Sequence, residues 1–503
     1  MKDDSILVIG AGFAGLAAGI YGQMNGYRAR VFEMHTQPGG LCTAWQRQGY
    51  TIDGCIHWLV GSSPRSGMHR LWEEVGIAQG RRFIDLDEYL RHETADGRTV
   101  VLYTDLERLE RHLRELSPQD TEPIGELIRG IRLFLGFDLP VDSEPLSRRV
   151  RKMLRLGWLI AAQGKALRRW LNTPITDFAR RFQDSALREA LLEAWVPEFS
   201  TFFLLFTFAW LHERNAGYPI GGSLPMSQAM ARRYTDLGGA IEYGQRVERI
   251  LVEGDRAVGV RLADGSEHRA DRVISAADGH ATLFDLLDGR YVDDEARRPY
   301  QEWPIFPPLL YVGLGVSRSF ADEPRTLSGF TYALRQPTRI GDAVRQRLAV
   351  HLYNQDPTLA PAGKTSMVVM LPSEYPYWQA LATDRAAYER AKEEVGRTVV
   401  AVLEQRFPGI AGQVEMVDVA TPLTFERYTG NWQGSFEGWL LTPQNAHTVM
   451  KPMRQTLPGL QGFYRCGQWV EPGGGLPTAV MSGRRLVRAI CREDGRRFRT
   501  RVS

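Results

Sequence analysis

The residues with the clearest chemical meaning are three glycines near the start of the chain. Residues 6–9 form a short apolar strand candidate, and Gly10, Gly12 and Gly15 follow in a turn that leads into a helix; a second strand then ends in Glu33. This order binds dinucleotides, because N–H groups at the helix start reach a pyrophosphate and the acid accepts hydrogen bonds from ribose hydroxyls. A carboxylate repels a 2′-phosphate, so Glu33 predicts FAD or NAD instead of NADP.

A second glycine cluster lies near the other end of the chain. Residues 463–466 predict a strand, Gly467 a turn, and 473–475 a glycine loop before a helix with Pro477 in its first turn. Successive glycines let a backbone lie against a flat ring. A helix N-terminus stabilises negative charge, such as that on the N1–C2=O edge of a reduced flavin. The two ends of the chain are therefore predicted to form one FAD-binding unit.

Composition limits the class of protein. The chain has 503 residues, 43% apolar and 24% charged, so we expect a folded protein of two or more domains. A net charge of +3 is too small to predict nucleic-acid binding. The four cysteines include no CxxC pair, which argues against structural zinc and a disulfide-reductase mechanism and indicates a reducing compartment. We expect no metal site and no secretory signal, and therefore a cytoplasmic location.

Two segments have unusual surface character. Between residues 147 and 176 no acidic residue occurs, while eight Arg or Lys side chains interleave with Leu, Ile and Trp. Such a basic amphipathic helix lies on an anionic membrane or packs on the protein's own core. Residues 199–211, "FSTFFLLFTFAWL", are too few to span a bilayer. They form a core helix, the wall of an apolar tunnel or an interfacial element.

The chain as a whole resembles the phytoene desaturase, carotenoid isomerase and retinol saturase group within the glutathione-reductase-like flavoproteins. The resemblance rests on "GAGFAGLAAG", "PGGLCTAW", "GYPIGGSLPMSQAM", "ADRVISAAD" and "GQWVEPGGGLPTAVMSG". It departs at Leu41 and Cys42, where many relatives carry Arg or Lys, and in "GQWVEPGGG", where desaturases often carry Thr and His. The resemblance implies tightly bound, non-covalent FAD and a long apolar substrate channel.

The resemblance also implies which residues bind the cofactor. The Gly39-Gly40 doublet would pass close to the diphosphate and ribityl of FAD, and the backbone of Val247 would contact the adenine. The predicted cofactor-binding set is Gly10, Gly12, Phe13, Ala14, Gly15, Glu33, Met34, Gly39, Gly40, Leu41, Val247, Gly467, Gln468, Gly475, Leu476 and Thr478.

Four residues flank these motifs and are candidates for the reaction centre: His57, Trp58, Trp469 and Glu471. Of these we expect His57, Trp469 and Glu471 to be catalytic. Glu471 would donate or accept a proton if burial raises its pKa, or else pair with an arginine. His57 would otherwise be a hydrogen-bonded core histidine.

The expected fold is α/β. A Rossmann-like FAD-binding domain of the glutathione-reductase-like type carries an inserted α+β substrate domain and a helical cap that contacts the membrane. We expect the discontinuous FAD-binding domain at 1–110, 217–290 and 445–503, the cap at 111–216 and the substrate domain at 291–444. The expected partners are an apolar lipid-like substrate, the inner face of the membrane, and an external electron acceptor or donor (oxygen, a quinone or a nicotinamide).

Several functions fit this pattern. The leading hypothesis is an oxidoreductase that desaturates or saturates C–C bonds of a polyene or isoprenoid lipid by hydride transfer to or from flavin N5. The alternatives are redox-neutral cis–trans isomerisation of a polyene on reduced FAD, amine oxidation, and a non-catalytic role like that of prenyl-protein escort proteins. The chain has a single complete GxGxxG motif, so we expect no second domain for NADPH.

Overall fold

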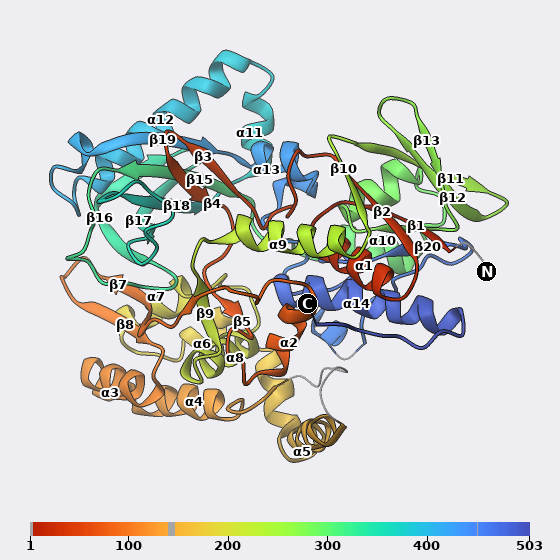
Figure 1. The fold of residues 1–503 in the computed structure, drawn as a ribbon. Helices are drawn as coiled ribbons and strands as arrows, with labels where there is room; N and C mark the ends of the chain where they lie inside the picture. Colours follow the sequence, from red (N-terminus) through yellow and green to blue (C-terminus); the bar gives the residue numbers. More distant parts are fainter. Residues whose placement is uncertain (1–3, 139–145, 450, 503) are drawn as a thin grey trace.

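A parallel sheet, on the right in Figure 1, draws its strands from both ends and the middle of the chain. The computed structural model describes residues 4–138, 146–449 and 451–502, with the side chains of 146, 148, 149, 156, 159 and 160 outside that description. The strand order is β10-β2-β1-β14-β20, and every pairing is parallel. The strands are β1 (Ser5–Ile9), β2 (Arg28–Glu33), β10 (Ala240–Tyr243), β14 (Arg272–Ser275) and β20 (Phe463–Arg465).

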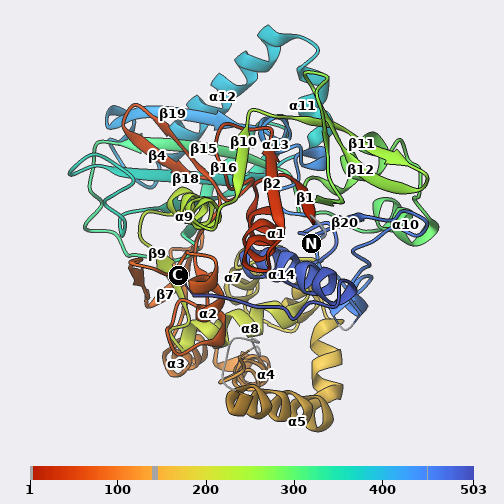
Figure 2. The ribbon, with the colours of Figure 1, turned by 45° about the vertical axis from the view of Figure 1, so that its right-hand side comes forward.

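Helices from opposite ends of the chain pack closely beside this sheet. Helix α1 (Phe13–Met24) contacts both α14 (Leu476–Glu493) and α9 (Ser223–Asp236), and Figures 1 and 2 show α1 and α14 side by side. A Cβ on Gly483 would lie 2.8 Å from the Ala18 nitrogen, and one on Gly19 would lie 2.8 Å from the Tyr234 ring. Glycine at these two positions therefore lets the helices approach.

A second, seven-stranded sheet has the order β19-β15-β18-β17-β16-β7-β8, antiparallel except between β16 and β7. Alternate residues of β15, such as Leu310 and Val312, are buried in a core with α12, while Gly313 faces Ile52 of a separate hairpin. The strands are β7 (Glu88–Glu93), β8 (Thr99–Tyr103), β15 (Leu309–Val316), β16 (Phe330–Ile340), β17 (Ala343–Leu352), β18 (Thr365–Pro372) and β19 (Val414–Ala420).

Strands β7 and β8 lie within residues 1–110, which are predicted to belong to the FAD-binding domain. Strand β7 pairs with β16, so that β7 and β8 extend the seven-stranded sheet. This pairing joins residues more than 200 positions apart, and no local pattern reports it. The domain boundaries stay predictions.

Three smaller β units complete the sheets. An antiparallel meander consists of β11 (Val247–Glu253), β12 (Arg256–Leu262) and β13 (Glu267–Arg269). The hairpin is β3 (Ala44–Arg47) with β4 (Tyr50–Asp53). A short sheet joins β5 (Leu59–Val60), β9 (Ala216–Pro219) and β6 (Phe83–Ile84).

Figure 1 shows α3, α4 and α5 along the lower edge of the molecule and α12 along its upper edge. The helices are α2 (Gly67–Glu74), α3 (Leu106–Leu116), α4 (Thr121–Arg132), α5 (Leu146–Leu171), α6 (Ile175–Ala179), α7 (Ser185–Glu193), α8 (Thr201–His212), α10 (Asp294–Glu302), α11 (Tyr375–Leu381), α12 (Arg385–Leu403) and α13 (Pro422–Thr429), with short turns η1 (Pro118–Asp120), η2 (Ala281–Leu286), η3 (Ile410–Gly412), η4 (Trp432–Gly434) and η5 (Ala446–Val449). Among the described residues, no helix has both the length and the apolar character that crossing a bilayer requires.

Candidate active site

The glycine turn after β1 has a backbone that only glycine adopts readily. Gly10 has a φ of +96° and donates its N–H to the Phe32 carbonyl at 2.8 Å. Gly15 lies so close to Gly10 that a Cβ would clash with the Gly10 carbonyl. Helix α1 begins directly after Gly12, which has no side chain to cap its first N–H groups. A phosphate at the helix N-terminus can accept hydrogen bonds from them.

Glu33 is held at the end of β2 by two backbone donors. Its carboxylate oxygens accept hydrogen bonds from the Ala11 N–H at 2.6 Å and the His35 N–H at 2.8 Å. Burial raises the pKa of Glu33, and these donors act against the rise. Each oxygen has a further lone pair for a ribose hydroxyl.

The Gly39-Gly40 doublet lies directly against the glycine turn. The Gly39 N–H donates to the Ala11 carbonyl at 2.9 Å, and Gly39 pairs with Gly12. Gly39 has a φ of +122°, and a Cβ there would lie 2.5 Å from Ser227 Oγ. Both the conformation and the space therefore require glycine at position 39.

The glycine loop before α14 has a similar requirement. Gly473, Gly474 and Gly475 have φ values of +106°, +66° and +87°. Gly467, after β20, donates its N–H to Ser482 Oγ at 3.0 Å, which ties the strand end to the helix. Residues at the start of α14 and at the start of α1 line the same space.

That space is a cavity of about 1940 Å³. Small-molecule pockets reach roughly 1,000 Å³, so this one has room for a dinucleotide and a second ligand. All of the predicted cofactor-binding residues except Gly15 line it, as do His57, Trp58, Trp469 and Glu471. Gly15 does not line the cavity but packs against the Gly10 carbonyl. The structure brings these residues together, while their individual roles remain predictions.

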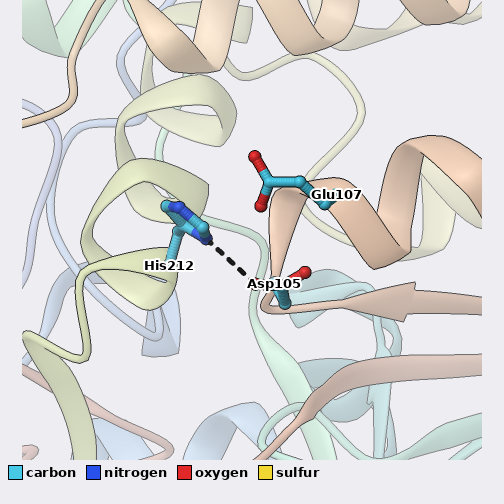
Figure 3. A group of neighbouring side chains, drawn as sticks. All are labelled: Asp105, Glu107 and His212. Carbon is cyan, nitrogen blue, oxygen red and sulfur yellow. Dashed lines mark ion pairs between the residues drawn. The ribbon is translucent and has the colours of Figure 1, made fainter.

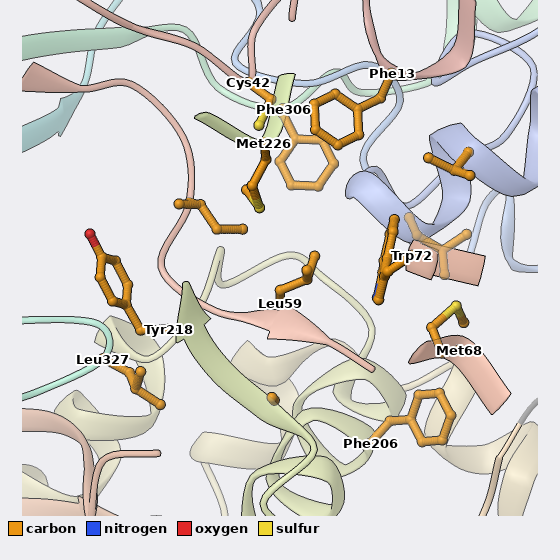
Figure 4. Close-up of a cluster of buried hydrophobic side chains, with 14 of the residues drawn as sticks. Phe13, Cys42, Leu59, Met68, Trp72, Phe206, Tyr218, Met226, Phe306 and Leu327 are labelled. Carbon is orange, nitrogen blue, oxygen red and sulfur yellow. The ribbon is translucent and has the colours of Figure 1, made fainter. Parts of the chain in front are cut away.

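An aromatic wall lines part of the cavity. Phe203, Phe206 and Trp210 of α8 line it, and the rings of Phe206 and Trp210 are 3.8 Å apart. Figure 4 shows Phe206 in the same buried cluster as Leu59 and Phe306, which also line the cavity. The other side of α8 is buried in the core, so residues 199–211 form a core helix and a cavity wall at once.

His57 lies on the ring of a second histidine. The centroids of His57 and His351 are 3.9 Å apart with an angle of 26° between the ring planes. Burial lowers the pKa of both rings, to about 4 for His351, and the neighbouring ring lowers that of His57 further. Both imidazoles are therefore neutral at pH 7. Position 351 lies far from the motifs in sequence, and no sequence signal identified it.

Trp469 and Glu471 have partners that define their orientation. Trp469 is buried and donates its Nε1–H to Asn431 Oδ1 at 3.3 Å, and Gln468 donates to the same oxygen at 3.0 Å. Glu471 forms an ion pair with Arg485. Burial raises the pKa of Glu471, and Arg485 opposes this effect. The Glu471 carboxylate thus pairs with an arginine, which is the alternative to proton transfer that the sequence predicts for this residue. Its part in the reaction stays a prediction.

Glu437 is an acidic residue that the sequence analysis did not select. It lines the cavity, and its carboxylate lies so close to Gly474 that a Cβ there would collide with it. Burial raises the pKa of Glu437 to about 8, although a hydrogen bond from the Gly475 backbone acts to lower it. One signal was available in the sequence: this acid sits inside the aromatic segment "RYTGNWQGSFEGW".

One group of side chains among the described residues has the spacing of a cation site. Asp105 and Glu107 at the start of α3 lie near His212 at the end of α8 (Figure 3). His212 Nδ1 is 3.6 Å from Asp105 Oδ2. However, Asp105 accepts the Arg108 N–H at 2.9 Å and His212 accepts the Leu106 N–H at 3.2 Å. These groups cap the helix, and we assign no metal to them.

Comparison with known proteins gives matches over nearly the whole chain. The model of the family described as flavin containing amine oxidoreductase matches residues 13–491. The lycopene-forming phytoene desaturase of Pseudescherichia vulneris is 26% identical over 503 residues, covering 95% of this chain and 97% of that protein. The chloroplastic prolycopene isomerase of Arabidopsis thaliana is 23% identical over 513 residues, covering 99% and 84%. The solved cyclohexylamine oxidase of Brevibacterium oxydans shares the fold, with a TM-score of 0.59 at 14% identity and coverage of 98% and 100%.

Proposed function

This chain belongs to the flavin containing amine oxidoreductase family, and we propose that it adds or removes hydrogen across C–C bonds of a long apolar polyene or isoprenoid lipid. It is an FAD-dependent oxidoreductase. The observation that carries the proposal is a cavity lined both by glycine-rich backbone and by the aromatic side chains of α8. The similarity to a phytoene desaturase and a prolycopene isomerase supports a carotenoid-like substrate.

The glycine-rich part of the cavity has the donors and acceptors that FAD needs. We assign Glu33 to the ribose hydroxyls, the first N–H groups of α1 to the pyrophosphate and the start of α14 to the N1–C2=O edge of the flavin. FAD supplies two-electron, hydride-type chemistry when bound. The protein's task is to hold the cofactor and the reacting bond together and to exclude water, for which the aromatic wall is suited.

Glu437 is the residue we assign to proton transfer. Adding hydrogen to a double bond needs a proton donor as well as a hydride, and removing hydrogen needs a proton acceptor. The Glu437 carboxyl lines the cavity beside the glycine loop. With a pKa of about 8 it holds a proton at neutral pH and loses it just above. A carboxyl poised in this range can serve either direction.

We further propose that the seven-stranded sheet forms the substrate domain and that α5 is a membrane-contacting part of a helical cap. Val150, Met153, Leu154 and Trp158 of α5 are exposed at helical spacing. Arg148 and Arg149 of the predicted basic segment have side chains outside the described part, whereas Arg151 and Arg155 are described and exposed. Contact with the inner face of the membrane would bring an apolar substrate to the cavity.

The experiment that tests the function is mass analysis of product. Membrane lipids and defined carotenoids are incubated with the purified enzyme, with oxidised or anaerobically reduced flavin and with a quinone or nicotinamide. The proposal expects a product that differs from substrate by two hydrogens. It fails if no apolar compound changes and only amines are consumed with release of peroxide.

Redox-neutral isomerisation is the second candidate, and the similarity to prolycopene isomerase favours it. In that case the product keeps the mass of the substrate and changes only in retention time and absorption spectrum. The same incubation with reduced flavin therefore separates the two candidates.

A further inference from the structure

Two cysteines that the proposed chemistry does not use face each other beside the glycine doublet. In the β3–β4 hairpin Ala44 pairs with Asp53. Continuing this antiparallel register by two residues along each strand places Cys42 opposite Cys55. Both cysteines line the cavity.

The hairpin geometry at this position suits a cross-link. Gly54 donates its N–H to the Thr43 carbonyl at 2.9 Å, which holds the two chain segments together one residue beyond the Ala44–Asp53 pair, whereas the Thr43 N–H turns back to the Leu41 carbonyl at 3.0 Å. Residues opposite each other in an antiparallel pair have Cα atoms about 4.5–5.5 Å apart. A disulfide needs a Cα separation of roughly 4.4–6.8 Å. This register is therefore compatible with a link between Cys42 and Cys55.

Side-chain hydrogen bonds hold both backbones in place. Ser227 Oγ donates to the Cys42 carbonyl, and the Cys55 N–H donates to Asp53 Oδ1 at 3.0 Å. The thiols of Cys42 and Cys55 interact with each other, and this interaction and burial raise the pKa of Cys55. The Cys55 thiol is thus protonated at rest, so we expect slow oxidation. Figure 4 shows Cys42 at the edge of the buried cluster, near Met226 and Phe306.

We propose that Cys42 and Cys55 form a reversible intramolecular disulfide, an oxidative modification site at the base of the hairpin. The link would arise by exchange with a small-molecule disulfide. The two cysteine sulfurs lose two electrons and two protons as their S–S bond forms, and the external S–S bond takes them up as it breaks into two thiols. The closed link would tie the Gly39-Gly40 turn to β4, which packs on the seven-stranded sheet.

The test counts thiols in the flavin-loaded enzyme. The protein is equilibrated with 2-hydroxyethyl disulfide, quenched in acid, denatured and alkylated, and its peptides are mapped by mass spectrometry. Of the four cysteines, we expect two to remain alkylatable, with an intact mass lower by two hydrogens and a peptide that joins Cys42 to Cys55. Dithiothreitol should restore all four.

The other two cysteines provide matched controls. Cys491 is fully buried within α14, and Cys466 donates to the Ala14 carbonyl at 3.8 Å. C491S should still form the link and leave one alkylatable thiol, whereas C42S and C55S should not form it. Four alkylatable thiols in the wild-type protein after long incubation, mixed disulfides alone, or a link between another pair would overturn the proposal. Lipid turnover is not measured, so this test and that of the proposed function fail independently.

Discussion

Gly12 and Gly15 belong to one motif but meet different constraints. A Cβ at Gly15 would clash with the Gly10 carbonyl, so this position sets how closely α1 packs on β1. At Gly12 the nearest heavy atom to a built Cβ is the Gly39 oxygen, 4.0 Å away, and the φ is −69°. The protein itself therefore tolerates a side chain at Gly12, and the space there is left for a ligand.

Substitution at these two glycines should separate cofactor binding from folding. We expect G12V to fold and give colourless protein, because the valine occupies the place of the pyrophosphate, and G15V to unfold or aggregate. Circular dichroism and the flavin absorbance of purified protein measure the two effects. Yellow G12V protein would show that the turn does not bind the cofactor.

The ionisation of the Glu437 carboxyl should be visible in the pH dependence of turnover. Its pKa of about 8 means that the carboxyl is protonated below this pH and ionised above it. If it donates a proton, kcat/KM falls above pH 8; if it accepts one, kcat/KM rises toward pH 8. We expect E437Q to lose this ionisation and about 10²- to 10⁴-fold in rate.

Glu471 provides the comparison for this variant. Its carboxylate pairs with Arg485, so we expect E471Q to retain the ionisation near pH 8 whatever its rate. Persistence of that ionisation in E437Q would exclude Glu437 as its source.

At the scale of elements, α5 differs from the other helices in the side chains that it exposes. Leu154 and Trp158 are 69% and 63% exposed, whereas Trp170 near the end of the same helix is 5% exposed and packs in the core. The helix is thus anchored at its C-terminal end. Removing the whole helix would expose the core around Trp170, so point substitutions are the better probe.

We expect L154S/W158S to bind anionic vesicles at least about tenfold more weakly than the wild type. Burying one such side chain contributes roughly 1.5–3 kcal/mol, and about 1.4 kcal/mol corresponds to a factor of ten in affinity. Vesicle co-sedimentation measures the effect. V344S, at a 53% exposed valine on β17, is the control and should bind as the wild type does. Equal binding by all three proteins would exclude α5 as the contact.

At the scale of the whole molecule, the cavity joins segments from both ends of the chain. Helices α1 and α14 pack together, and each begins at the cavity. A ligand that contacts both starts binds only the folded arrangement, since the unfolded chain does not bring them together. Cofactor binding and global stability are therefore coupled.

Removal of FAD should accordingly lower the melting temperature. At a free FAD concentration of 100 Kd the expected stabilisation is about 2.7 kcal/mol. Differential scanning calorimetry of apoprotein with increasing FAD measures it, and G12V should show no shift. A melting temperature that does not depend on FAD would mean that the cofactor does not bridge the two ends.

Local sequence patterns were sufficient to predict those parts of the structure whose conformation is set by residues nearby in the sequence. The glycine turn with Glu33 and the glycine loop before α14 agree with the sequence expectation. Backbone conformation and helical periodicity are set within a few residues, so a sequence reports them directly.

Tertiary structure alone decided which distant groups meet. The stacking of His57 on His351, the position of Glu437 against Gly474, and the pairing of β7 with β16 each join segments that no periodicity connects. Such contacts follow from strand order and from the packing of whole elements, which are chosen by burial over the entire chain. For this reason the glycine-rich backbone that lines the cavity was predictable from motifs, whereas the titratable groups of the cavity and the extent of the second sheet were not.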